Sequence, residues 1–132
     1  MNNRNDEITF VAPVIAIIQP FLPKNWKDLR LRLNINKGFY EIYFYVNTNG
    51  QWWHSLDLWK LFSIDMDKFD DLYNEMCDKV YDLCIDDQQE KQWTSCTIKV
   101  LNTGRFNLEF EYDDRIEHED WLKKQNIEHI KR

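Results

Sequence analysis

The sequence has few of the residues that interrupt regular structure. It holds three glycines and three prolines in 132 residues, which argues against long disordered linkers and predicts a single domain over residues 1–132. Each glycine stands alone at a predicted turn, so there is no phosphate-binding glycine loop. The GxSxG, HExxH and EF-hand patterns are also absent. We therefore expect no cofactor and no enzymatic activity.

Cysteine is scarce as well. The three cysteines, Cys77, Cys84 and Cys96, are odd in number and lack CxxC spacing, which argues against a disulfide framework and a zinc site. We expect buried, reduced thiols and no bound metal. Cys77 and Cys84 lie in an acidic segment, where neighbouring carboxylates raise a thiol pKa, so a thiol nucleophile is disfavoured.

No long hydrophobic run is present. The apolar stretch from Val11 to Ile18 is interrupted by Pro13 and followed by Pro20, and it is too short to span a bilayer. It also lacks the basic flank and the cleavage site of a signal peptide. The sequence thus predicts a cytoplasmic protein with no membrane partner.

Hydrophobic periodicity and turn residues predict an α+β fold. Asn49-Gly50 fits a type I′ hairpin turn, and Ser63 or Asp65 can cap the helix that follows. The expected elements are a helix within Asp6–Gln19, strands at Leu29–Asn36, Phe39–Asn47 and Gln51–His54, a helix ending near Asp86–Gln88, strands at Ser95–Val100 and Arg105–Tyr112, and a helix at His118–His129. Tight turns, Lys37-Gly38 among them, indicate an antiparallel sheet of about five strands with helices packed mainly on one face.

The two faces of this sheet differ in polarity. Leucines and isoleucines alternate with polar residues from Leu29 to Asn36, which predicts one buried face and one solvated face. The residues expected on the solvated face are Arg30, Arg32, Glu41, Tyr43, Tyr45, Thr97, Lys99, Asn107 and Glu109.

Negative charge is concentrated in one segment. The formal net charge is −6, which argues against nucleic acid as a partner and permits a basic protein. Residues 65–90 hold ten acids and two bases, a net charge of −8. Apolar residues there form one predicted helix face: Phe69, Leu72, Tyr73, Met76, Val80 and Leu83. Acids form the opposite face: Asp67, Asp71, Glu75, Asp78 and Asp82.

This acidic face has two interpretations. It is either an ordinary solvated surface or one that steers a basic partner, for which a nuclease with a basic cleft is the obvious candidate. The candidate contact residues outside the helix are a second acidic run, Glu109, Glu111, Asp113 and Asp114, and the aromatic residues Tyr43, Tyr45, Trp52 and Trp53. An acid–base pair or a metal site could instead involve His54 near Asp57, or His118 among carboxylates. We disfavour both sites, because carboxylates beside a surface histidine are expected by chance in a chain that is 30% charged.

Several motifs resemble one family. They are Leu22-Pro23-Lys24-Asn25-Trp26, the Tyr43-Phe44-Tyr45 hairpin with Asn49-Gly50 and His54, Trp93-Thr94-Ser95, and the stretch from Gly104-Arg105-Phe106 to Tyr112-Asp113-Asp114. Together they resemble the YezG/EsaG-like immunity proteins, the antitoxins of bacterial secreted polymorphic toxins. Trp52-Trp53 departs from the smaller residues of that family.

This resemblance implies a small α+β protein that binds and neutralises a cognate toxin domain one to one, the toxin often being a nuclease. It carries over no catalytic residue and does not say which residues touch the toxin or whether contact-dependent inhibition is involved. A non-catalytic adaptor that binds a basic protein is the second hypothesis, and an enzyme with a site near His54 and Asp57 is the third.

Overall fold

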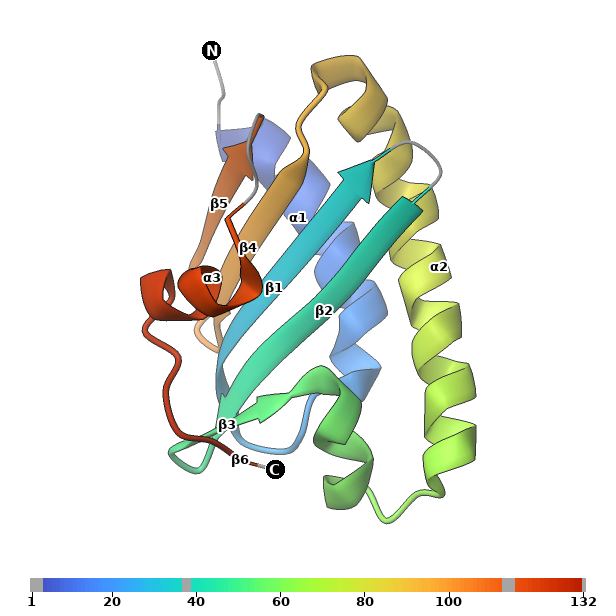
Figure 1. The fold of residues 1–132 in the computed structure, drawn as a ribbon, viewed down its shortest axis with the longest axis vertical. Helices are drawn as coiled ribbons and strands as arrows, with labels where there is room; N and C mark the ends of the chain where they lie inside the picture. Colours follow the sequence, from blue (N-terminus) through green and yellow to red (C-terminus); the bar gives the residue numbers. More distant parts are fainter. Residues whose placement is uncertain (1–3, 37–38, 113–115, 132) are drawn as a thin grey trace.

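The α+β fold predicted from the sequence is confirmed in the computed structural model, which describes residues 4–36, 39–112 and 116–131, with side chains from residue 7 onward (Figure 1). The elements are α1 (Arg4–Ile18), the 3-10 helix η1 (Gln19–Phe21), β1 (Trp26–Asn36), β2 (Phe39–Thr48), β3 (Gln51–His54), the 3-10 helix η2 (Ser55–Leu61), α2 (Met66–Lys91), β4 (Ser95–Leu101), β5 (Phe106–Glu111), α3 (His118–Lys124) and β6 (Ile130–Lys131). The turn predicted at Lys37-Gly38 lies outside the described residues.

The sheet follows the predicted antiparallel plan with one addition. Its strand order is β5-β4-β1-β2-β3-β6, and every pair except the last is antiparallel. Asn49 and Gly50 connect β2 to β3 with φ of 53° and 78°, as the predicted type I′ turn requires. β6 was not predicted, because its two residues pair in parallel with Trp52 and Trp53 and carry no periodicity.

The main core lies between one face of the sheet and the two long helices. α1 and α2 run side by side across that face, behind the sheet in the view of Figure 1. Leu29, Leu31 and Leu33 of β1 meet this layer, as do Phe44 and Val46 of β2. Pro13 is accommodated within α1 because it lies on the exposed side of that helix.

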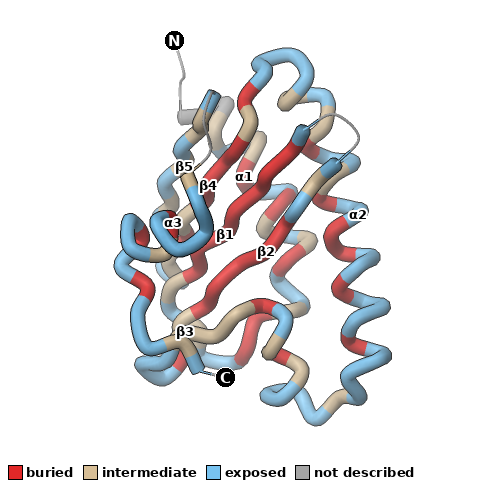
Figure 2. The backbone as a smooth tube through the Cα atoms, in the orientation of Figure 1, coloured by how far each residue is buried: buried red, intermediate tan, exposed pale blue. Residues whose placement is uncertain are grey.

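The opposite face of the sheet is also covered at its centre, and here the expectation of a solvated face is wrong. Burial is continuous from Leu29 to Ile35, so both faces of β1 are buried (Figure 2). The cover is α3 and the turn after it, whose Trp121 and Ile127 form a second apolar cluster. Of the nine residues predicted on the solvated face, five are buried: Arg30, Arg32, Tyr43, Tyr45 and Thr97.

Two buried arginines join the sheet to this cover. Arg30 donates to both carboxylate oxygens of Asp28, at 2.8 and 3.0 Å, and to the carbonyl oxygen of Gln125. Arg32 donates to the carbonyl of Ile116 at 2.8 Å, and its guanidinium lies 5.5 Å from the ring centre of Trp121. These contacts satisfy charged groups that would otherwise be costly to bury.

Within the described ranges no helix combines the length and the apolar character that crossing a bilayer requires.

Candidate partner-binding surface

The α2 helix begins and ends at recognisable caps. Asp65 Oδ1 accepts a hydrogen bond from the amide of Asp67 at 3.3 Å, so the predicted cap is confirmed. At the other end Gln92 has a left-handed φ of 60°, and Lys91 pairs with Asp87 at 2.9 Å. A carboxylate at the start and a cation at the end both complement the helix dipole.

The buried side of α2 differs from the predicted one at two positions. Leu72 and Leu83 are 40% and 44% exposed, so their predicted place against the sheet is wrong. Cys77 and Cys84 are buried instead. At 3.6 residues per turn, the two leucines fall roughly a quarter turn from the centre of the buried stripe. The buried residues of the helix are Phe69, Tyr73, Met76, Cys77, Val80 and Cys84.

The predicted acidic face does project away from the core. Its five acids, Asp67, Asp71, Glu75, Asp78 and Asp82, are all exposed. Lys79 pairs with Glu75 at 3.2 Å, and the Tyr40 hydroxyl donates to Asp78, which raises the pKa of Tyr40 to about 12. Asp71 and Asp82 form no ion pair within the described chain. The face therefore keeps most of its negative charge for the solvent or a partner.

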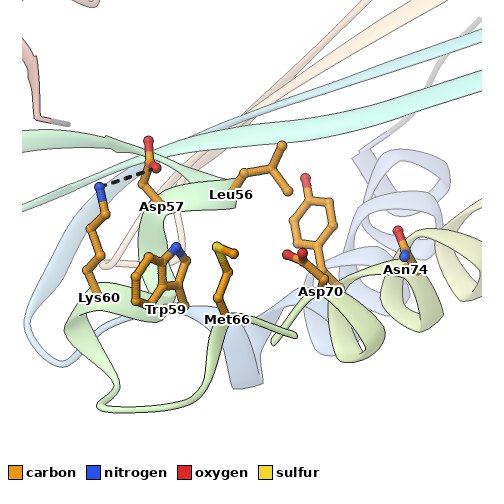
Figure 3. Close-up of a pocket in the computed structure, with 8 residues that line it drawn as sticks. Leu56, Asp57, Trp59, Lys60, Met66, Asp70 and Asn74 are labelled. Carbon is orange, nitrogen blue, oxygen red and sulfur yellow. Dashed lines mark ion pairs between the residues drawn. The ribbon is translucent and has the colours of Figure 1, made fainter. Parts of the chain in front are cut away.

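A hollow of about 480 Å³ lies where η2 meets the first turns of α2 (Figure 3). Leu56 and Met66 project into it from its two sides, and both are 48% exposed. An ion pair of 3.6 Å between Asp57 and Lys60 edges the hollow on the η2 side, and Asp70 edges it on the α2 side. The complete lining is Leu56, Asp57, Trp59, Lys60, Met66, Asp70, Tyr73 and Asn74. Sequence reasoning missed this site, although apolar residues in the connection before α2 could have indicated it.

The aromatic contact candidates lie elsewhere. Tyr43 and Tyr45 are only 7% and 3% exposed because α3 covers them, so they have little surface to offer a partner. Trp52 is half-buried beneath the guanidinium of Arg30, 5.4 Å from its ring centre, and Trp53 is half-buried against the main core.

The second acidic run is only partly described. Glu109 is exposed on β5 and pairs with Lys124 at 2.8 Å, whereas Glu111 on the same strand is half-buried. Asp113 and Asp114 lie outside the described residues. The structure thus brings together the five acids of α2 but does not join Glu109 and Glu111 to them.

The histidines take part in contacts that build the fold. His54 Nδ1 accepts the Leu56 amide at 3.0 Å, and burial lowers the His54 pKa, which keeps the ring neutral at pH 7. Asp57, the proposed partner of His54, instead pairs with Lys60. His118 Nε2 lies 2.9 Å from the Tyr45 hydroxyl.

The three thiols are buried, as predicted. Burial raises the pKa of Cys77 to about 12, and the nearby charge of Asp78 adds to this. Burial raises the pKa of Cys84 to about 12 as well, with Asp87 as the neighbouring charge. Burial also raises the pKa of Cys96 well above its ordinary value. Across the part of the chain that the structure describes, no three His, Cys, Asp or Glu side chains gather as metal ligands would.

Comparison with known proteins identifies the family. Residues 11–131 match the family model described as immunity protein YezG-like. The chain belongs to the YezG-like immunity protein family. Immunity protein YezG of Bacillus spizizenii is 30% identical to it over 108 residues. That match covers 77% of this chain and 66% of the relative, so the chain spans just under two thirds of the relative's length.

The resemblance to YezG-like immunity proteins noted in the sequence is therefore confirmed, and two of its motif residues, Trp93 and Gly104, have structural roles. Trp93 is fully buried after α2, and its indole nitrogen donates to Asp87 at 2.9 Å. Gly104 has a φ of 92° in the turn from β4 to β5, a conformation that favours glycine. Both residues support the fold and lie off the acidic face of α2.

Proposed function

We propose that this protein is an antitoxin that binds a cognate secreted toxin domain directly, one to one, and blocks its activity. Membership of the YezG-like immunity protein family is the observation that supports this role most strongly. The protein performs no catalysis in this proposal, because an immunity protein needs only to occupy the toxin. It acts in the cytoplasm, where it meets a toxin delivered from outside.

We further propose that the toxin is a nuclease. Enzymes that act on nucleic acid bind the phosphate backbone through clusters of Lys and Arg. The α2 face presents exposed carboxylates at steps of three or four residues, a rise of about 6 Å for each four. Such a row of negative charge is complementary to a basic cleft and would speed association with it. The acids of α2 thus occupy the cleft in place of the nucleic-acid substrate.

An inhibition assay on a secreted toxin domain from the cell that makes this protein, taken from a gene next to its own where one is found, tests both proposals. The purified domain is assayed on plasmid DNA and on RNA while this protein is titrated into the reaction. We expect cleavage of one substrate by the toxin alone, and complete inhibition at one equivalent. An unrelated basic nuclease serves as the control and should remain active. A toxin domain that keeps its activity at a large excess of this protein would contradict the antitoxin role. Inhibition of a toxin that cleaves neither substrate would contradict only the nuclease assignment.

A further inference from the structure

Exposed apolar side chains are concentrated in the segment from η2 to the start of α2, and two of them, Leu56 and Met66, line the hollow. Among the described residues, four of the large hydrophobic side chains that remain exposed lie within the eleven residues from Leu56 to Met66. The four are Leu56, Leu61, Phe62 and Met66. Single exposed apolar residues are ordinary, but a concentration of them marks a surface that contacts another molecule.

The back of the hollow is held rigid by buried hydrogen bonds. The Tyr73 hydroxyl donates to the Ile42 carbonyl at 3.1 Å and lies 2.8 Å from Ser55 Oγ. Ser55, the first residue of η2, also accepts the amide of Phe44 at 3.3 Å. Both η2 and α2 are therefore fixed to β2, and the hollow exists before any partner arrives. A preformed site loses less conformational entropy on binding.

Acids surround this apolar centre. Residues 56–71 hold five acids and two bases, a net charge of −3. Asp70 lines the hollow itself, and the acidic face of α2 continues from it through Asp71. An apolar centre with a charged rim is the usual arrangement of a protein-binding surface, in which the centre provides most of the affinity.

We infer that this hollow receives an apolar side chain of the toxin that is flanked by Lys or Arg, while the acids of α2 contact the basic surface around it. The inference rests on the proposed function and adds the place where the toxin is anchored. Met66 suits this role, because its flexible thioether adapts to the shape of an incoming side chain. A second copy of this chain is a poorer occupant, since its own acids would be brought against this acidic rim.

Truncation of the two apolar walls tests the anchor. The double variant Leu56→Ala with Met66→Ala is compared with Ile8→Ala and Leu83→Ala, a matched pair whose side chains are each 44% exposed and do not line this hollow. The probe is the toxin domain of the inhibition assay carrying an inactivating substitution, and binding rates are measured on a sensor surface. We expect the hollow variant to bind about tenfold more weakly, chiefly through faster dissociation, and the control pair to bind within about twofold of the unaltered protein.

A second measurement needs no variant. The protein has three methionines, Met1, Met66 and Met76, and their methyl groups can be labelled with carbon-13. Met66 lines the hollow and Met76 is buried in the core, so the Met66 signal should move or broaden when the toxin domain is added. If the circular dichroism spectrum of the hollow variant matches that of the unaltered protein, its weaker binding does not come from unfolding.

The outcomes separate this inference from the proposed function. If the unaltered protein neither binds nor inhibits the toxin domain, both fail. If it binds while the hollow variant binds equally well and the Met66 signal stays in place at saturation, only the anchor is wrong. A Met66 signal that moves with the concentration of this chain alone, together with a dimer in sedimentation, would assign the hollow to self-association instead.

Discussion

Replacing Trp121 by alanine should remove a large share of the stability of this fold. Trp121 is fully buried, its indole nitrogen donates to Thr97 Oγ1 at 2.9 Å, and its ring lies beside the guanidinium of Arg32. Buried Trp→Ala substitutions cost about 3–5 kcal/mol, against a total free energy of unfolding of about 5–15 kcal/mol for a typical domain.

The expected loss converts into a measurable shift of the melting temperature. An unfolding entropy of about 2.1 cal/mol/K per residue gives about 0.28 kcal/mol/K for 132 residues. A loss of about 4 kcal/mol should therefore lower the melting temperature by about 14 °C. Trp121→Phe keeps an aromatic ring but loses the hydrogen bond to Thr97, and should cost about 1–2 kcal/mol.

Urea and thermal unfolding followed by far-ultraviolet circular dichroism measure both variants. Lys123→Ala, at an exposed position of the same helix, is the control and should change stability by less than about 0.5 kcal/mol. A Trp121→Ala loss below about 1 kcal/mol would contradict the packing of α3 on the sheet, because it would mean that α3 leaves this face open to solvent.

Three further outcomes are expected. Because the pKa values of Cys77 and Cys84 are raised to about 12, and that of Cys96 well above its ordinary value, almost no thiolate forms at pH 8. A thiol reagent should then react with all three only in denaturant, and fast stoichiometric reaction of the native protein would contradict this. Asp65→Ala removes the cap of α2 and should lower the free energy of unfolding by about 1 kcal/mol. Asp67→Asn keeps the cap and is the comparison. Equal urea midpoints for the Asp65 variant and the unaltered protein would show that the cap contributes nothing. In Gly50→Ala the added Cβ meets no atom within 4 Å, but the alanine must adopt a φ of 78°. This backbone strain should lower the free energy of unfolding by about 1 kcal/mol in the same urea assay. An unchanged urea midpoint would argue against the type I′ turn.

Local patterns predicted the parts of the fold that local forces determine. The alternation from Leu29 to Asn36 predicted β1, and the Asn49-Gly50 pair predicted a hairpin. Two candidate caps, Ser63 and Asp65, predicted the start of α2, and Asp65 is the cap in the structure. Each depends on backbone preferences or on hydrogen bonds between near neighbours, which the sequence displays directly.

Features that depend on distant packing were not predicted. Arg30 and Arg32 alternate with leucines as solvated residues would. Nothing nearby shows that Gln125 and Trp121, some ninety residues later, contact Arg30 and Arg32 respectively. Periodicity likewise gave the acidic side of α2 correctly but placed Leu83 where Cys84 is buried. The hollow was not predicted because its shape depends on how two elements, η2 and α2, pack against each other.

In the proposed mechanism, the acidic face of α2 guides the toxin to this protein. Its most direct test is the association rate of the toxin domain with the variant Asp71→Lys and Asp82→Lys, measured at low and at physiological salt. Both positions are exposed, so the fold should be unaffected. The exposed pair Glu119→Lys and Glu128→Lys changes the net charge equally on a different surface and is the control. We predict that the α2 variant associates about tenfold more slowly at low salt, with a weaker salt dependence, while the control stays close to the unaltered protein. Equal association rates for the α2 variant and the unaltered protein at both salt concentrations would contradict the claim.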